Sequence, residues 1–124
     1  MAAKNIGALL VLALSLSACA LGERHLGGHY TLVSLDPDNS AIKDQNDTMV
    51  IFPNVTFYEK SGVHIYGCRQ RSKAIVDTSG QFTTGFGWFL INEKNGRVEQ
   101  SLSLEQLVQK LPGAAEKARS ARCD

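Results

Sequence analysis

The sequence lacks the motifs and the charge imbalance by which many enzymes and nucleic-acid-binding proteins are recognised. Its 124 residues contain no serine elbow, no HExxH sequence and no zinc-spaced pair of cysteines, so we expect no enzymatic activity, no cofactor and no metal site. The 13 Lys and Arg residues almost equal the 12 Asp and Glu residues. Because such a chain has little electrostatic attraction for a polyanion, we also expect no nucleic-acid partner. The length suits one small domain.

A hydrophobic run long enough to cross a bilayer is missing as well, since a spanning helix needs about 20 apolar residues. The apolar stretch over residues 6–16 follows Lys4 and ends in small residues, which is the pattern of a secretory signal. We therefore predict a signal peptide over residues 1–18. Its removal takes away Lys4, its only charged residue, and leaves 12 basic and 12 acidic residues.

Leu16, Ser17, Ala18 and Cys19 resemble the bacterial lipobox, in which an apolar residue and two small residues precede a cysteine at the end of the signal's apolar core. The resemblance implies a diacylglycerol thioether on Cys19, cleavage after Ala18 and acylation of the new amino terminus. Several acyl chains anchor a protein stably, because each buried CH₂ contributes about 0.8 kcal/mol. An ordinary signal peptide followed by an unmodified Cys19 is the alternative. Lipoproteins that stay in the inner membrane tend to carry an aspartate directly after the lipidated cysteine. This chain has Ala20 there, so by analogy we expect the protein on the periplasmic face of the outer membrane.

The mature chain divides by composition into a short tether and one globular domain. Residues 19–28 mix charge with glycine and have no periodicity, so we predict a lipidated tether there and a single domain over residues 29–124. From residue 30 onward, short β-rich runs alternate with turn residues. The predicted strands are residues 30–35, 48–52, 55–59, 63–68, 73–77, 81–84, 88–92 and 98–102. Pro53 marks a break between two of them because it has no amide to donate.

The last strands and the C-terminal region carry the clearest local patterns. Asn95 and Gly96 predict a two-residue type I′ hairpin that pairs residues 88–92 with 98–102. Apolar residues then recur with helical spacing at Leu104, Leu107, Val108 and Leu111. Ser103 and Gln106 fit a capping box, Pro112 ends the helix, and residues 114–121 form a second helical stretch. We predict an α+β fold, with a small antiparallel sheet or partly open barrel followed by a C-terminal amphipathic helix.

Cys68 and Cys123 are the two cysteines that remain once Cys19 is lipidated. In an exported domain such a pair is expected to form a disulfide. In the chain-entropy model, closing this loop stabilises the fold by roughly 4 kcal/mol. The alternative is a nucleophilic Cys68 served by His64. On a strand these two residues share a face but lie apart along it, which disfavours the alternative.

Two segments carry partial metal-binding patterns. Residues 36–47 place oxygen side chains at positions 1, 3, 5, 9 and 12 of a twelve-residue calcium loop. Ala41 stands where the sharp turn requires glycine and no helices flank the segment, so a polar surface loop is the main interpretation and calcium binding stays open. His25 and His29 have the spacing of a helical metal pair. The glycines between them disfavour a helix, so we assign both histidines to the tether.

Two further clusters are interpreted as structural. Residues 69–73 form a basic cluster, which we expect to be a solvated turn, with lipid phosphates as the alternative ligand. Residues 85–89 carry three aromatic side chains among two glycines, and we expect them in the core at a bulge or strand entry.

Three features of the sequence are taken together: the strand from Tyr30 to Leu35, the sequence Gly67-Cys68-Arg69 and a turn at Ser79-Gly80. In these features the chain resembles the META-domain lipoproteins. These are small β-rich envelope proteins that include heat-shock-associated members. The resemblance implies an envelope-stress or surface role and no defined catalytic residues.

The sequence therefore predicts a non-enzymatic, membrane-anchored envelope lipoprotein that acts as a binding or assembly-support module, with another envelope protein as its partner. One alternative is a periplasmic inhibitor or immunity protein against a cell-wall hydrolase. A second alternative is an enzyme that uses Cys68.

Overall fold

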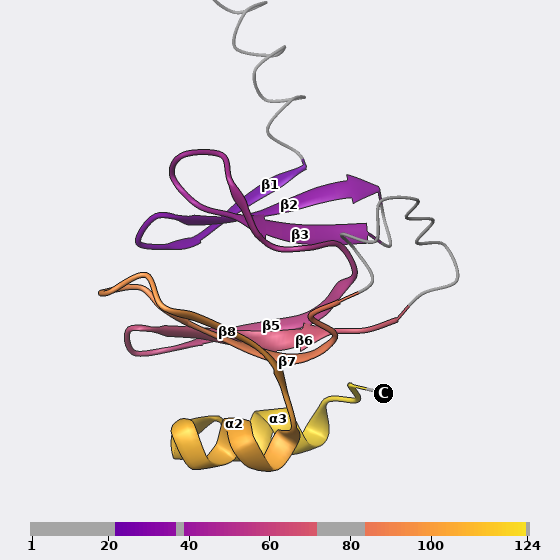
Figure 1. The fold of residues 1–124 in the computed structure, drawn as a ribbon, viewed down its shortest axis with the longest axis vertical. Helices are drawn as coiled ribbons and strands as arrows, with labels where there is room; N and C mark the ends of the chain where they lie inside the picture. The colour runs from indigo at the N-terminus through magenta and orange to yellow at the C-terminus, as the bar shows by residue number, and fades with distance from the viewer. Residues whose placement is uncertain (1–21, 37–38, 72–83, 124) are drawn as a thin grey trace, which may run out of the picture.

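The structure is a computed structural model that describes residues 22–36, 39–71 and 84–123. The described elements form three layers, two sheets and a helical layer (Figure 1). The first sheet contains β1 (Glu23–Gly27), β2 (Tyr30–Asp36), β3 (Asn39–Lys43) and β4 (Met49–Ile51), in that order. The second contains β5 (Val55–Ser61), β6 (His64–Arg69), β7 (Gly87–Asn92) and β8 (Val98–Leu102), also in order. The helical layer contains α2 (Leu104–Lys110), the 3₁₀ turn η2 (Pro112–Ala114) and α3 (Ala115–Ser120).

All neighbouring strands in both sheets are antiparallel, and the helices follow the strands, so the mixed α+β architecture is present. The finer expectation of one sheet or a partly open barrel is replaced by two four-stranded sheets among the described residues. The chain passes from one sheet to the other between Ile51 and Val55. Pro53 lies in this connection, where its missing amide ends the first sheet, and Asn54 adopts a positive φ of 85° that turns the chain.

The first core lies between the two sheets. It is built from alternate residues of the strands, because every second side chain on a strand faces the same side. The buried side chains of this core are Tyr30, Leu32, Ile42, Ile51, Val55, Ile65, Phe89 and Ile91.

The second core lies between the second sheet and the helices, and it uses the opposite faces of β6 and β7. Its buried members are Tyr66, Cys68, Trp88, Leu90, Leu107, Ala114 and Ala118. These two strands therefore have core on both faces, which explains their nearly continuous apolar sequence. Gly67 lies at a close approach in β6, because an added Cβ would come within 2.6 Å of the Phe89 ring and closer still to the Phe57 carbonyl oxygen.

The predicted tether over residues 19–28 is wrong for the part that the structure describes. Glu23–Gly27 forms β1, which pairs with β2, and Leu26 packs against the first core. The globular domain thus includes residues that the sequence analysis placed outside it. One apolar residue in a five-residue strand leaves no periodic pattern, and the strand depends on its pairing partner.

The predicted polar loop over residues 36–47 is also wrong as a single loop. Asn39–Lys43 forms β3, in which Ala41 is 1% exposed and Ile42 is fully buried. The sequence pattern does not indicate this strand, because only two apolar residues stand among polar ones and pairing with β2 determines their burial. The strand predicted over residues 73–77 lies outside the described residues, as do residues 81–83 of the strand predicted over 81–84. Thr84, the last residue of that prediction, is described and precedes β7 without belonging to a strand.

The β7–β8 pairing is confirmed, but the predicted two-residue type I′ turn is wrong. The amide of Asn92 donates to the carbonyl of Arg97 at 2.9 Å, so the loop contains four residues, 93–96. Gly96 has a positive φ of 74° but Asn95 has no positive φ, whereas a type I′ turn requires a positive φ at both residues. The side chain of Asn92 accepts the amides of Lys94 and Asn95, which stabilises the longer loop.

The predicted capping box is confirmed at the start of α2. The Ser103 side chain accepts the amide of Gln106 at 3.1 Å, and the Gln106 side chain accepts the amide of Ser103 at 2.8 Å. Leu107 is the buried contact of this helix with the second sheet. No helix in the described ranges has the length and apolar character that crossing a membrane requires.

Candidate functional site

Cys68 and Cys123 form a disulfide, with their Cα atoms 5.7 Å apart and the two residues 55 positions apart in sequence. Cys68 is fully buried on β6, so the bond fastens the C-terminal segment to the middle of the second sheet. The side-chain amide of Gln70 donates to the carbonyl of Arg122 at 2.8 Å beside the disulfide. The end of the chain is therefore held to β6 by a covalent bond and a hydrogen bond.

The alternative pair of His64 and Cys68 is not brought together as a nucleophile and its base. His64 is opposite Asn92 at the start of β6, and it lines a surface depression with Arg97 and Lys110. Cys68 is opposite Trp88 near the other end of the strand. The sulfur of Cys68 is bonded to Cys123, so it carries no thiolate in this state.

Arg69 contradicts the expectation that residues 69–73 form a solvated turn. Its side chain is fully buried at the end of β6. Its Nε donates to the carbonyl of Pro53 at 2.8 Å, and its Nη1 donates to the carbonyl of Thr84. The guanidinium carbon lies 4.2 Å from the centre of the Phe86 ring, over which Arg71 also lies at 4.7 Å. β6 extends one residue farther than predicted, and this places Arg69 inside.

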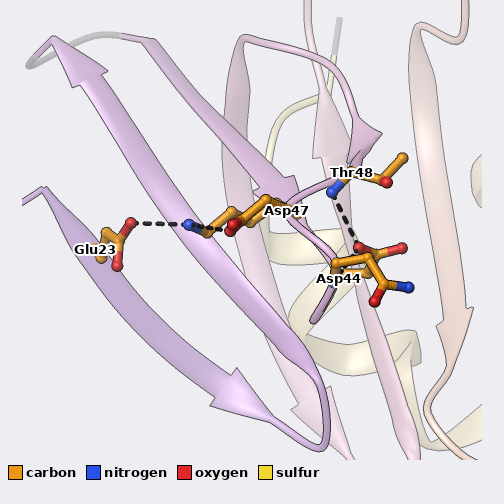
Figure 2. A network of polar contacts seen from close by, with 6 residues as sticks. Glu23, Asp44, Asp47 and Thr48 are labelled. Atoms are coloured by element: carbon orange, nitrogen blue, oxygen red, sulfur yellow. Dashed lines mark hydrogen bonds and ion pairs between the residues drawn. The ribbon is translucent and has the colours of Figure 1, made fainter.

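Two acidic residues of the proposed calcium segment, Asp44 and Asp47, are engaged within the protein (Figure 2). One carboxylate oxygen of Asp44 accepts the amides of Asn46 at 2.8 Å and Thr48 at 3.0 Å. Asp47 pairs with Lys43 at 2.8 Å, and Lys43 also binds Glu23 at 2.9 Å. These hydrogen bonds, first that of Asp47 and then that of Glu23, raise the pKa of Lys43.

Metal binding gains no support from the arrangement of the described side chains. Within residues 22–36, 39–71 and 84–123, no group of three or more His, Cys, Asp and Glu side chains is placed to hold a metal ion. His25 is exposed on β1 and His29 is exposed in the following turn. Cys19, the predicted lipidation site, lies outside the described residues together with Leu16, Ser17 and Ala18.

A groove of about 310 Å³ lies between β1 of the first sheet and β5 of the second. We name it the β1–β5 groove. Its walls are two outer strands, and its floor is apolar because Leu26 and Ile65 lie there, with Ile65 only 1% exposed. The residues that line it are Arg24, His25, Leu26, Tyr58, Glu59, Lys60 and Ile65.

Arg24 and Tyr58 connect the two walls of the β1–β5 groove. Nη1 of Arg24 donates to the Tyr58 hydroxyl at 2.9 Å, and the guanidinium carbon lies 5.7 Å from the centre of the Tyr58 ring. The hydrogen bond uses one of the five N–H groups of the guanidinium. The tyrosine thus fixes the direction of the arginine while most of its donors stay available.

The other charged side chains of the groove have partners. Lys60 lies 3.2 Å from Glu93, and Glu59 lies 3.0 Å from Lys117 on α3. Lys60 and Glu93 are close enough to form an ion pair, but the buried Oε1 atom of Glu93 accepts no hydrogen bond from any residue that the structure describes. Arg24 has no ion pair with a carboxylate among the described residues, which leaves the groove with uncompensated positive charge.

No pattern in the sequence indicated this groove. Tyr58 falls in a predicted strand, but Arg24 lay in the predicted tether, so nothing indicated that the two would meet. A weak indication was available in the alternation of Tyr58 and Lys60, which places both on one face of β5.

No protein-family model, no curated protein and no solved structure matches the chain.

Proposed function

We propose that the protein is a non-enzymatic lipoprotein of the cell envelope, anchored through acyl chains on Cys19 and acting there as a binding or assembly-support module. The observation that carries this proposal is the sequence Leu16-Ser17-Ala18-Cys19 at the end of an apolar run. Ala20 after the cysteine favours the periplasmic face of the outer membrane. The resemblance to META-domain lipoproteins agrees with an envelope role.

The short distance between the predicted anchor and the folded domain supports a role at the membrane surface. β1 begins at Glu23, which is the fourth residue after Cys19. Four extended residues span at most about 14 Å. A domain tethered so closely stays beside the lipid headgroups, where its partners would be membrane-associated or periplasmic proteins of the same compartment.

The state of Cys68 supports binding rather than catalysis. A nucleophilic cysteine must reach its substrate as a thiolate. Cys68 is instead fully buried and disulfide-bonded, and His64 faces a different part of the surface. A binding module needs no reactive group, and the domain offers a shaped surface in the β1–β5 groove.

The proposal is tested by the fate of Cys19→Ala in a bacterial host. We expect the wild-type protein to partition into the detergent phase and to incorporate labelled palmitate, and the variant to lose both properties, because the acyl chains are its main membrane attachment. The double variant Cys68→Ser/Cys123→Ser is the matched control and should keep both. Normal processing and full membrane retention of Cys19→Ala would refute the lipoprotein assignment.

A crosslinking experiment addresses the binding role. A photoreactive residue at the exposed position 25, beside the β1–β5 groove, is compared with one at exposed position 105 on α2. If one of the two positions is crosslinked to a single envelope protein and the other is not, the result would support the assignment as a binding module. Capture of a cell-wall hydrolase that the purified protein inhibits would instead favour the inhibitor alternative.

A further inference from the structure

The β1–β5 groove has a strand edge along each of its walls. Among the described residues β1 pairs with β2 alone and β5 pairs with β6 alone, so each has one edge outside the ladder. An outer strand presents backbone N–H and C=O groups with which an extended peptide can pair. The groove is therefore shaped for a strand rather than for a compact small molecule.

Charge determines which strand it fits. Arg24 is directed by the Tyr58 hydroxyl at 2.9 Å and has no carboxylate partner in the described part of the chain. The other two charged side chains that line the groove are compensated, since Lys60 is paired with Glu93 and Glu59 with Lys117. The mature chain has no net charge to produce a general attraction for acidic molecules. The positive potential is thus a local property of the groove.

The floor of the groove determines the side-chain pattern of its occupant. Leu26 and Ile65 are apolar, and Arg24 stands beside them on the same strand as Leu26. Alternate side chains of a strand point to one face and are about 7 Å apart. An inserted strand that carries an acidic residue opposite Arg24 would place its next inward side chain over the apolar floor, where an aliphatic residue fits.

We propose that the β1–β5 groove binds an extended acidic segment of a partner protein, which adds to the edge of β1 and pairs a carboxylate with Arg24. A planar guanidinium binds a carboxylate through two parallel hydrogen bonds, which gives both affinity and register. The inference rests on the proposed binding function and names the chemistry of the partner. A different use of the same charge is to protect the edge, because inward-pointing charges on outer strands prevent self-pairing.

The test uses the full-length protein in neutral detergent and a labelled six-residue peptide of alternating Glu and Val, with blocked ends. We expect saturable binding by fluorescence anisotropy, with amide resonances of β1 and β5 shifting on titration. The peptide of alternating Lys and Val should not bind. Arg24→Gln should weaken binding by about tenfold, as expected for the loss of a charge-assisted contact. Arg24→Lys should recover part of the affinity because it keeps the charge.

Arg119→Gln is the matched control, since it removes the same charge from an exposed position on α3 and should leave the affinity unchanged. Equal binding of the Lys–Val peptide, unchanged affinity in Arg24→Gln, or no binding of the Glu–Val peptide would overturn the inference. Self-association of Arg24→Gln without peptide binding by the wild type would assign Arg24 to edge protection. Any of these results would refute the assignment of the groove as the peptide-binding site. The proposed function would still stand if anchoring depends on Cys19 and the partner is crosslinked at another part of the surface.

Discussion

Arg69 donates a hydrogen bond from its Nε to the carbonyl oxygen of Pro53 at 2.8 Å, and through this contact the end of β6 holds the connection between the two sheets. The same side chain donates to the carbonyl of Thr84 before β7. One buried arginine thus ties together three segments that are distant in sequence. Its burial also excludes it from the surface turn in which the sequence analysis placed it.

The first prediction is that Arg69→Met lowers the free energy of unfolding by about 3 kcal/mol, because the substitution removes the donor to the buried Pro53 carbonyl and the donor to the part-buried Thr84 carbonyl. Arg69→Lys should destabilise less, since an ammonium group keeps the charge but not the forked geometry. Urea denaturation followed by circular dichroism measures both. Arg119→Met, at an exposed position, is the control and should change stability by no more than about 0.5 kcal/mol. Equal effects of the Arg69 and Arg119 variants would contradict the prediction.

The second prediction concerns the bond between Cys68 and Cys123. Replacing both with Ser should lower the free energy of unfolding by about 4 kcal/mol, which is the chain-entropy value for closing a loop of 55 residues. The sheets should persist, because both cores keep their other members. Alkylation of the non-reduced native protein, followed by peptide mass analysis, should leave Cys68 and Cys123 unmodified. An alkyl group on each would contradict the disulfide and make the His64–Cys68 pair the next one to examine.

The third prediction is that Gly67→Ala destabilises the protein by about 1–3 kcal/mol, the usual cost of overpacking a filled core. The added Cβ would approach the Phe89 ring to 2.6 Å and the Phe57 carbonyl more closely. Gly113→Ala is the matched control, because its Cβ would lie 3.6 Å from Ser61 Oγ, an ordinary contact. Thermal unfolding compares the two variants, and a Gly67→Ala protein as stable as the control would show that β6 is packed more loosely.

The fourth prediction concerns alkaline pH. Burial, followed by the charge of Glu59, raises the pKa of Tyr66, and burial followed by Asp44 and Glu93 raises that of Tyr30. A group with a raised pKa in the folded state stabilises the fold fully below its unfolded pKa of about 10, and this contribution is lost as the pH rises through the folded value. Stability should therefore fall above about pH 10.

Tyr66→Phe tests that prediction, because it removes one of the titrating groups. The variant should show a shallower decrease of the unfolding midpoint between neutral and strongly alkaline pH than the wild type. An absorbance titration of the tyrosines should show their ionisation displaced upward in the folded protein. A decrease of the same slope in both proteins would assign the alkaline loss to other groups.

Local patterns accounted for the elements that need no distant partner. The capping box of Ser103 and Gln106 and the helix from Leu104 follow from residues within one or two turns of each other, and the structure has them where the sequence predicted. β8 also keeps its predicted bounds, Val98–Leu102. β1 and β3 could not be found in this way, since a short strand with one or two apolar residues is stabilised by its neighbours in the sheet.

The sequence by itself determined the pairing of β7 with β8, the helix that starts at Leu104 and the break at Pro53, because these depend on neighbours along the chain. Only the tertiary structure decided that there are two sheets, that Arg69 is buried and that Arg24 meets Tyr58 across a groove. Arg24 and Tyr58 are 34 positions apart. The contact exists because two sheets pack face to face, and no local preference of either residue encodes that packing.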